Sequence, residues 1–475
     1  MDSYKDFKFK DDETPKYVQV ANYIKALIDN KKIKDGDKLP TIRALSKKLG
    51  VNNTTIVSAY NKLKAEGYAF QKVGSGSYAK IREVSSNFRR EYSNTLKKLS
   101  MEDLSDVVDF TGETSKEVLF PIDDLKYIIN KVLERDGANA LISDNRNGYT
   151  NLIYTINKVF LNYKLKDEDI IIVSGAQQGI DIASKGILNI NDNIIVEKPT
   201  YAGALSVFKW RRVNLFEVTM EDDGINVDKF EKILQKNKIR CFYTMSYFQN
   251  PTGISYSNEK KKRILELAEI YDFYIIEDDY LSELIYENSI EYIPFKWLDK
   301  NDRVIYIKSF SKIFLPGIRL GYLVAPTIFR EALQNSKHNT DIVTSSLMQR
   351  ALELYISENK WQENIKNLND EYVKRYSYMK KILDEEFSDI LTYNDPKGGL
   401  NFYLTLIDPF KMNTKELFRR LRQRKVYITP GTMFFTSQND GQDSFRIAFY
   451  QTNNYKIEKG MRILKEELLS EKVRK

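Results

Sequence analysis

The sequence predicts a multidomain α/β protein with a small N-terminal module of three helices and a β-hairpin, a large α/β domain built on a mostly parallel sheet, and a small C-terminal α+β domain. Three observations predict this organisation. The chain has 475 residues, more than one ordinary domain holds. Its first 80 residues show the apolar spacing of short helices. From about residue 109, short apolar runs alternate with longer helical stretches.

Composition limits the classes of protein that remain. Hydrophobic residues make up 42% of the chain, which allows a large core. The single cysteine, Cys241, excludes an internal disulfide and fits a reducing compartment. The charged start and the absence of a long uncharged apolar run predict a soluble, cytoplasmic protein without membrane segments. One histidine, His338, excludes histidine-based triads and histidine-rich metal sites, so no metal is expected.

Residues 1–80 predict a winged helix-turn-helix. "YVQVANYIKALIDNKK" has apolar residues at helical spacing, and a second helix follows Pro40 and stops at Gly50. After a very short turn, "VNNTTIVSAYNKLKAEG" predicts a third helix with a face of Ile56, Ala59, Tyr60 and Leu63. "YAFQKVGSGSYAKI" then reads as strand, Gly-rich turn and strand. Two helices joined by a tight turn and followed by a hairpin form this fold.

The charge of this module indicates a polyanionic partner. Residues 1–80 contain 16 Lys and Arg against 9 Asp and Glu, a net charge of +7, while the whole chain is +8. A basic N-terminal module (the head, residues 1–80) joined to a nearly neutral remainder (the body, from about residue 109) indicates a nucleic-acid partner. A solvated lysine-rich surface is the ordinary alternative. The third helix is expected to enter the major groove by its N-terminal end, beside a slim wing tip. The candidate DNA-binding residues are Arg43, Asn52, Asn53, Thr54, Thr55, Lys72, Gly74, Ser75, Gly76 and Ser77.

A polar stretch separates this module from the body. Residues 81–108 lack a clear apolar stripe and are expected to form a linker with partial helix, which fully extended would reach roughly 90 Å. The body is expected to have a large part from about 109 to 340 and a small part from about 341 to 475. Its predicted strands are the apolar runs at 170–173, 194–197, 241–246, 274–277, 304–307 and 444–450.

Polar residues follow these strands, at the edge where open parallel sheets bind ligands. They are Ala176 and Gln177 at a helix N-terminus, Tyr201, Asn250, Asp278 and Tyr280, and Ser309, Ser311, Lys312 and Arg319 in "SFSKIFLPGIRLGYL". Each has an ordinary alternative, such as a helix cap, a surface ion pair or a solvated lysine. Taken together, these residue types match the binding requirements of a single ligand.

That ligand is pyridoxal 5′-phosphate. A buried lysine can form a Schiff base with an aldehyde. A carboxylate can keep a pyridine nitrogen protonated, because an opposite charge favours the charged form. An arginine, two serines and a helix N-terminus can hold a phosphate. An aromatic ring can stack on a flat cofactor, and an asparagine amide can bind its phenolic oxygen.

The body resembles the fold-type I aminotransferases, in particular the branch with aminoadipate and kynurenine aminotransferases. "SGAQQG", "NPTG", "EDDY" and "SFSKIFLPGIRLGY" occur here in that branch's order. The resemblance implies that Lys312 is the Schiff-base lysine, Asp278 the pyridinium partner and Tyr201 the stacking ring. It also implies that Asn250 and Tyr280 contact the cofactor's 3-oxygen. The implied phosphate ligands are Ser309, Ser311, Arg319 and the N–H groups of Ala176 and Gln177, and Arg446 in "SFRIAFY" matches the arginine for a substrate carboxylate.

The N-terminal module resembles the GntR family of transcription regulators over "GDKLPTIRALSKKLGVNNTTIVSAYNKLKAEGYAFQKVGSGSYAK". Joined to an aminotransferase-like body, it resembles the MocR subfamily. That resemblance implies a regulator that binds a double-stranded DNA operator and senses an amine, an amino acid or pyridoxal phosphate itself at Lys312. It also implies a homodimer, because fold-type I bodies share residues between subunits. The alternative is a working aminotransferase that acts on an amino acid, since its residues are retained.

Two departures from these families affect the expectations. Family regulators commonly have an arginine near the start of the recognition helix, where this chain has Asn53. The γ-aminobutyrate regulators usually carry an arginine two residues after the stacking tyrosine, where this chain has Gly203. A second carboxylate-binding arginine is therefore missing at that position, which disfavours γ-aminobutyrate. An α-amino acid held by Arg446 and pyridoxal phosphate both remain open as effectors.

Overall fold

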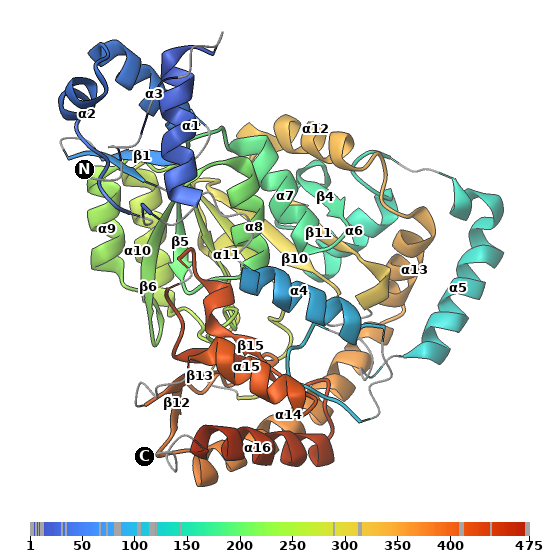
Figure 1. Ribbon diagram of the computed structural model, residues 1–475. Coiled ribbons are helices and arrows are strands. Elements are labelled where there is room, and N and C mark those ends of the chain that lie inside the picture. Colours follow the sequence, from blue (N-terminus) through green and yellow to red (C-terminus); the bar gives the residue numbers. More distant parts are fainter. Residues whose placement is uncertain are drawn as a thin grey trace. The chain divides into compact units, whose positions relative to one another are not determined.

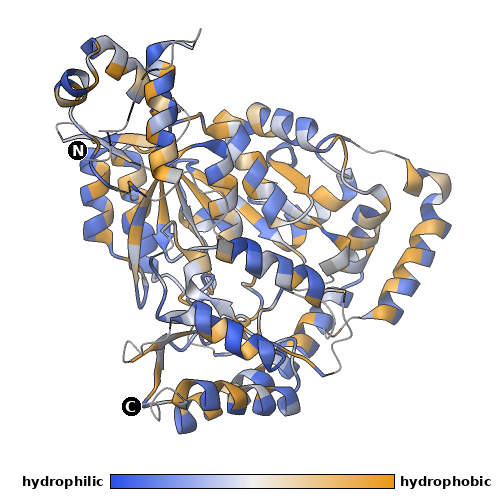
Figure 2. Ribbon diagram, viewed as in Figure 1, coloured by the Kyte–Doolittle hydropathy of each residue, from blue (hydrophilic) through white to orange (hydrophobic). Residues whose placement is uncertain are grey.

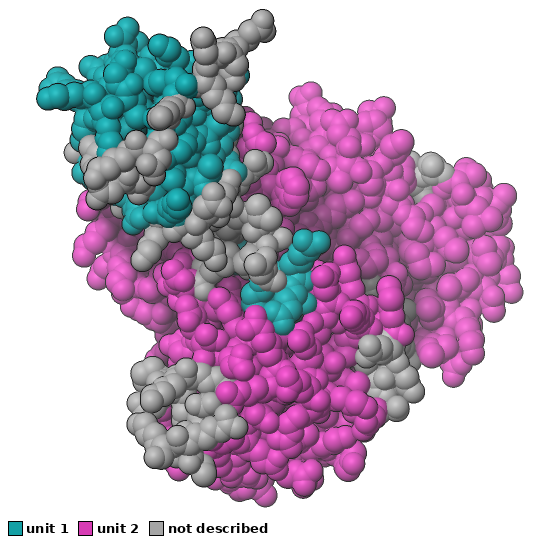
Figure 3. Space-filling view, viewed as in Figure 1, with its two compact units in different colours: residues 1–92 teal, residues 93–475 magenta. Residues whose placement is uncertain are grey.

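The chain divides into two compact units, Met1–Tyr92 and Ser93–Lys475, which Figure 3 colours teal and magenta. Within the described part of the chain, no helix is both long enough and apolar enough to cross a lipid bilayer. The computed structural model describes residues 4, 7, 9, 14–29, 32–33, 36–65, 68–72, 75–79, 87–101, 106–113, 119, 121–142, 145–287, 290–311, 316–407, 413–437 and 439–470.

The N-terminal unit contains the winged helix-turn-helix that the sequence predicts. The apolar stripes of its helices meet in one core, in which Val20, Leu45 and Ile56 are at most 1% exposed. Its strands pair antiparallel, with Lys72 opposite Gly76 beside the turn. The elements are α1 (Lys16–Asp29), α2 (Ile42–Leu49), α3 (Asn53–Ala65), β1 (Ala69–Lys72) and β2 (Gly76–Ala79).

Local caps set the tight turn between α2 and α3. Helix α2 begins after Thr41, whose hydroxyl accepts a hydrogen bond from the Ala44 N–H, rather than directly at Pro40. It ends at Gly50, which has φ 63°, a left-handed conformation that costs glycine little. Helix α3 then begins at Asn53, so the turn is as short as the sequence predicts.

Helix α4 (Asn87–Leu99) lies inside the stretch that the sequence predicts as a partly helical linker. The boundary between the two compact units falls within this helix. Its second half is fixed to the body, because Arg422 Nη1 donates a 3.1 Å hydrogen bond to Thr95 Oγ1. A helix rises about 1.5 Å per residue, less than half of an extended chain. Because residues 87–99 are helical, residues 81–108 span less than the roughly 90 Å of a fully extended chain.

An eight-stranded sheet lies at the centre of the body (Figure 1), in the order β4-β11-β10-β9-β8-β5-β6-β7. Strands β10, β9, β8, β5 and β6 are parallel, and β11 is antiparallel to both β4 and β10, so β4 shares their direction. The prediction of a mostly parallel sheet is confirmed. The strands are β4 (Ile170–Val173), β5 (Asn193–Lys198), β6 (Asn214–Glu221), β7 (Gly224–Ile225), β8 (Cys241–Thr244), β9 (Tyr274–Asp279), β10 (Val304–Ser309) and β11 (Gly321–Val324).

Helices pack on this sheet, and its strands are mostly apolar while the flanking helices carry both apolar and polar residues (Figure 2). Ile180 of α7, Phe208 of α8 and Leu333 of α12 are fully buried in one core with the strands. The helices of the large part are α5 (Ile122–Asp136), α6 (Thr150–Val159), α7 (Ala176–Ile187), α8 (Ala202–Arg211), α9 (Val227–Lys236), α10 (Asn258–Ile270), α11 (Phe295–Leu298) and α12 (Arg330–Thr340), with short 3-10 helices at η2 (Gly137–Leu141), η3 (Asp167–Asp169), η4 (Pro316–Ile318) and η5 (Thr327–Phe329).

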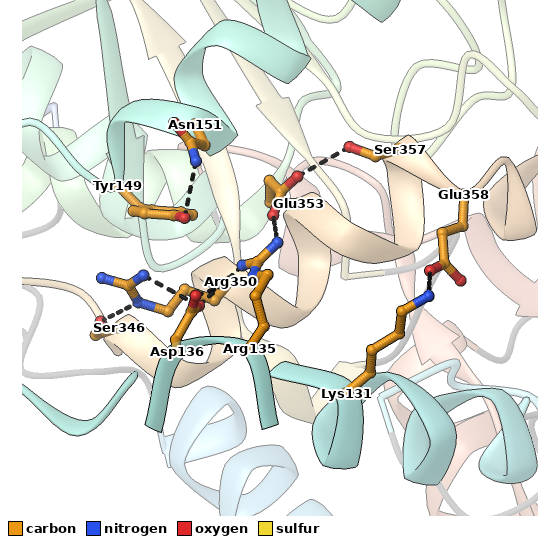
Figure 4. Close-up of polar contacts among 10 residues, drawn as sticks. All are labelled: Lys131, Arg135, Asp136, Tyr149, Asn151, Ser346, Arg350, Glu353, Ser357 and Glu358. Carbon is orange, nitrogen blue, oxygen red and sulfur yellow. Dashed lines mark hydrogen bonds and ion pairs between the residues drawn. The ribbon is translucent and has the colours of Figure 1, made fainter. Parts of the chain in front are cut away.

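Helix α13 (Ser346–Ser357) packs against α5 and α6, so it joins the large part although it follows the expected boundary near residue 340. Ion pairs fix α5 to it (Figure 4): Arg135 to Glu353 at 2.8 Å and Lys131 to Glu358 at 2.5 Å. The guanidinium of Arg350 on α13 pairs with Asp136 at 3.1 Å.

The small part is an α+β layer. Its antiparallel sheet has the order β12-β13-β16-β15, and β14 pairs in parallel with β3 from the start of the body. The start of the body is thus bound into the C-terminal part. The elements are β3 (Val108–Asp109), α14 (Lys360–Glu386), β12 (Leu391–Tyr393), β13 (Asn401–Leu406), α15 (Thr414–Gln423), β14 (Val426–Tyr427), β15 (Thr429–Pro430), η6 (Gly431–Phe434), β16 (Ser444–Ala448) and α16 (Asn454–Leu469).

Candidate cofactor site and nucleic-acid interface

The carboxyl ends of β4, β5, β8, β9 and β10 lie at one edge of the sheet, because these strands run in one direction. The predicted site residues lie at or after these ends, apart from Arg446, which lies on β16 of the small part. Among them, Asp278, Asn250, Ser309, Ser311 and Arg446 are each at most 7% exposed. Lys312 lies outside the described residues.

One end of the site is a small polar cradle around Gly175. A Cβ atom placed on Gly175 would lie 3.4 Å from both Ser311 Oγ and Arg319 Nη2, so the missing side chain leaves room between a hydroxyl and a guanidinium. The Ser311 hydroxyl is buried without a hydrogen-bond partner among the described residues. Arg319 donates a hydrogen bond to the Ser174 carbonyl and has φ 48°, an uncommon conformation for a residue with a side chain.

Helix α7 adds backbone donors to this cradle. It begins at Ala176 and Gln177, directly after Gly175, and no side chain caps its first turn. The first N–H groups of a helix have no partner within the helix and carry the positive end of its dipole. A phosphate group fits here, because it would satisfy these donors, the Ser311 hydroxyl and Arg319 together. Ser309 supports the cradle indirectly, since its hydroxyl accepts a 3.3 Å hydrogen bond from the Ser311 N–H.

The Asp278 carboxyl group occupies the deeper end. Its Oδ2 accepts a 2.8 Å hydrogen bond from the Tyr243 hydroxyl, and its Oδ1 is buried without a partner among the described residues. Burial raises the pKa of Asp278 to about 7, although the hydrogen bond from Tyr243 lowers it in part. A carboxylate that lacks one partner fits a protonated ring nitrogen, which would complete its hydrogen bonds and keep it ionised.

The Tyr201 ring stands at the N-terminus of α8. A Cβ atom on Gly203 would lie within 2.5 Å of this ring and would also collide with the Gln177 amide, whose Nε2 donates to the Gly203 carbonyl. Gly203 therefore permits the ring and the amide to pack closely. An arginine at position 203 has no room in this arrangement, which gives a physical reason for the departure noted from the sequence.

The small part contributes the Arg446 guanidinium from β16. Arg446 Nη1 donates a 2.7 Å hydrogen bond to Asn250 Oδ1, and Nη2 donates 2.6 Å to the Thr111 carbonyl. Tyr280 is partly buried, and its hydroxyl donates to the Phe248 carbonyl at 3.4 Å. A buried, hydrogen-bonded guanidinium beside an amide can bind a ligand carboxylate.

Sequence reasoning missed three groups. Tyr243 reads as an ordinary core residue of β8, and only strand pairing shows that it supports Asp278. Lys308 is a second buried lysine that pairs with Asp279 at 3.2 Å and Glu283 at 2.7 Å. Glu113 pairs with Arg446 at 3.1 Å from a segment far away in the sequence. No local motif signals these partners.

A buried carboxylate also organises the segment that carries Asn250. Glu197 on β5 is fully buried and accepts hydrogen bonds from the side chains of Thr244, Gln249 and Tyr256. Burial raises the pKa of Glu197 to about 7, and these donors lower it in part. These hydrogen bonds fix the loop after β8 to β5, the strand that pairs with β8.

The candidate DNA-contacting residues gather at the start of α2, the start of α3 and the hairpin. Thr55 and Ser77 are partly buried, Gly74 lies outside the described residues, and the Lys72 side chain is not described. A polar, exposed helix start with a neighbouring arginine suits DNA contact. The exposed members are Arg43, Asn52, Asn53, Thr54, Ser75 and Gly76.

Two family models match the chain. Residues 117–464 match aminotransferase class I and II, and residues 16–78 match the bacterial regulatory proteins of the gntR family. The body and the head are therefore each recognised separately, with the residues between 78 and 117 outside both.

Individual relatives have either the body or the whole organisation. An aromatic-amino-acid aminotransferase 1 from Thermococcus litoralis is 32% identical and aligns with 78% of this chain and 90% of the relative. The uncharacterized HTH-type transcriptional regulator YdfD of Bacillus subtilis is 27% identical over 94% of this chain and 95% of its own. The crystal structure of a multiple substrate aminotransferase from Thermococcus profundus superposes with a TM-score of 0.74 at 30% identity, covering 83% of this chain and 98% of that one.

Proposed function

This chain belongs to the MocR subfamily of GntR-type regulators, whose body is a class I and II aminotransferase domain, and we propose that it regulates transcription by sensing an amino compound, or pyridoxal phosphate itself, at Lys312. It is a DNA-binding regulator, and its family implies pyridoxal 5′-phosphate as cofactor. The strongest support for sensing is that one chain joins an exposed recognition-helix start to a body that retains the polar cradle and the half-satisfied Asp278.

We assign the cofactor contacts as follows. Bound pyridoxal 5′-phosphate supplies an aldehyde that condenses with amines and a ring that withdraws electrons. Asp278 would hold the ring nitrogen protonated, and Tyr201 would stack on the ring. Asn250 and Tyr280 would contact the 3-oxygen of the cofactor. The phosphate ligands are Ser309, Ser311, Arg319 and the N–H groups of Ala176 and Gln177, and Arg446 binds the effector carboxylate.

Lys312 is proposed as the reacting amine, and the state of Lys308 supports this choice. Burial alone lowers the pKa of Lys308, but the attraction of Asp279 and Glu283 outweighs it and raises the pKa. Lys308 is thus held as an ammonium ion, which has no lone pair for an aldehyde. Effector binding at Lys312 shifts DNA affinity only if it favours one of two body conformations, typically by about 1–3 kcal/mol.

A homodimer forms part of the proposal. Large apolar side chains are exposed on and around α5, and such patches on a protein surface mark contacts with partners. A dimer of the chain would present two N-terminal units to DNA, and would therefore bind two half-sites. The exposed residues there are Leu119, Ile122, Tyr127, Leu133, Leu141 and Ile142, at 39% to 70% exposure.

Borohydride reduction tests the lysine. The cofactor-loaded protein is reduced and digested, and the modified peptide is identified by mass. The adduct is expected on Lys312, and Lys312→Ala is expected to lose the visible cofactor band while the folded protein still binds DNA. Lys308→Arg keeps the buried charge and is expected to retain the adduct. An adduct on another lysine would refute the assignment.

A gel shift tests the regulator against the enzyme. The full chain is mixed with the DNA upstream of its own coding sequence, with and without pyridoxal phosphate and candidate amines. DNA binding that changes with one of these ligands is expected. Keto-acid formation from amino acids and 2-oxoglutarate measures turnover in parallel. Turnover without any DNA binding would favour the aminotransferase alternative.

A further inference from the structure

A carboxylate stands beside the arginine that is proposed to bind the effector. Glu113 Oε1 lies 3.1 Å from Arg446 Nη2, and the two side chains are 48% and 5% exposed. The guanidinium is therefore buried, while the carboxylate reaches it from a more open position. A buried cation needs a compensating charge, and Glu113 supplies it in the ligand-free protein.

The turn that carries Glu113 is fixed to the same strand as Arg446. The Phe110 carbonyl accepts a 2.7 Å hydrogen bond from the Ala448 N–H, and the Gly112 carbonyl accepts a 2.8 Å hydrogen bond from the Tyr450 hydroxyl. Gly112 has φ 70°, and a Cβ atom there would lie only 3.0 Å from Ala448 Cβ. Glu113 is thus held at the site by its backbone.

The charge around Glu113 changes when Arg446 takes a ligand. Among the described residues, Arg446 is the cation that forms an ion pair with Glu113. An effector carboxylate on Arg446 then leaves the negative charge of Glu113 without its partner. Gly203 brings no positive charge to compensate it.

From this balance we infer that Glu113 selects the effector, and that the effector is an α-amino acid with a positively charged side chain. Its α-carboxylate replaces Glu113 on Arg446, and its side-chain cation then pairs with Glu113. A side-chain carboxylate would face Glu113 without a matching cation and is rejected. This inference rests on the proposed function, because it assumes that Arg446 binds the effector.

Amino acids of matched shape test this charge preference on the cofactor-loaded, full-length protein. Ornithine, norvaline and glutamate have carbon skeletons of one length with a positive, neutral and negative end. Arginine and citrulline form a second pair, in which the guanidinium does not condense with an aldehyde. Affinities are measured by calorimetry and by the change in the visible spectrum of the cofactor. Each cationic ligand is expected to bind at least about tenfold more tightly than its neutral match, which corresponds to about 1.4 kcal/mol.

Variants assign the preference to Glu113. Glu113→Gln is expected to remove the difference between arginine and citrulline, and Glu113→Lys to favour glutamate instead. Glu385→Gln, an exposed glutamate on α14, is the control and is expected to keep the preference. Equal affinities within both series, preference for glutamate in the unaltered protein, or no binding of any of these ligands would overturn the inference. These results leave the Lys312 adduct and DNA binding intact, whereas failure of the proposed function shows as loss of those two signals.

Discussion

The Tyr243 hydroxyl donates a 2.8 Å hydrogen bond to Asp278 Oδ2, while Oδ1 of the same buried carboxyl group has no partner among the described residues. Asp278 is thus half satisfied by the protein and oriented by a neighbouring strand. A carboxylate fixed in this way has one face prepared for a cation, and the protein need not reorganise to receive it.

Tyr243→Phe is expected to weaken cofactor binding about tenfold, because hydrogen bonds to charged groups contribute about 1.5–3 kcal/mol. Without the hydroxyl, the pKa of Asp278 rises further and less carboxylate is present at neutral pH. Spectral titration with pyridoxal phosphate measures the affinity. Tyr274→Phe on the next strand, β9, serves as control. Unchanged affinity in Tyr243→Phe would show that the hydrogen bond is unimportant.

The buried Asp278 also predicts a pH dependence of the cofactor-free protein. Its pKa is raised from the usual 3.8 to about 7, so the folded protein keeps a proton that the unfolded chain releases between these values. The stability that comes from this proton is complete below about pH 3.8 and is lost as the pH rises to about 7. Glu197 and Glu277, with pKa values raised to about 7, act in the same direction.

Asp278→Asn is therefore expected to reduce the loss of unfolding free energy between pH 5 and 8, by on the order of 2–4 kcal/mol. Thermal or urea unfolding of the cofactor-free protein measures this. Asp123→Asn, at a side chain that is 98% exposed, is expected to leave the slope unchanged. An Asp278→Asn slope equal to that of the unaltered protein would mean that the carboxyl group is not kept protonated by burial.

Arg43→Ala is expected to weaken operator binding about tenfold and to reduce the slope of log affinity against log salt by about 1, as for one lost phosphate contact. The cofactor spectrum stays unchanged, since the substitution lies in the head. Lys64→Ala, at the other end of α3 from the predicted contact, gives the comparison. If both variants lost affinity equally, the charge of the head rather than the predicted docking would explain DNA binding.

Gly203→Ala is expected to lower cofactor affinity about tenfold, because the added methyl group displaces the Tyr201 ring and overpacking costs about 1–3 kcal/mol. The control is Gly186→Ala, which overpacks α7 against Leu333 away from the site. It is expected to lower the melting temperature while cofactor affinity is retained. Equal cofactor affinity in Gly203→Ala and the unaltered protein would show that the close packing is not needed.

Continuous apolar runs identified the buried strands of the sheet. The run at 170–173 coincides with β4, and the run at 304–307 lies within β10. Strand β6 was not predicted, since it is partly exposed along much of its length and lacks such a run. Strand β11 was also missed, although it is buried, because it follows the Arg319 segment directly and was read as part of that motif. Fully buried, apolar strands are thus easier to recognise than partly exposed strands or strands beside a motif.

The candidate site likewise contains residues that the sequence revealed and residues that it did not. Residues at or soon after strand ends, such as Asp278 at the end of β9 and Asn250 in the loop after β8, could be found from the sequence because parallel strands end at one edge. Tyr243, Lys308 and Glu113 could not, since their roles depend on contacts between distant segments. Glu113 meets Arg446 across 333 positions of the chain. A pattern within one stretch of sequence contains no information on such a pair.

Helix α4 stiffens the segment of chain that it occupies. It is about 20 Å long, and Thr95 in its second half is hydrogen-bonded to Arg422 of α15 in the small part. A tilt of the small part would therefore carry the second half of α4 with it. A helix transmits such a rotation along its own length, whereas an extended chain of the same residues would absorb it.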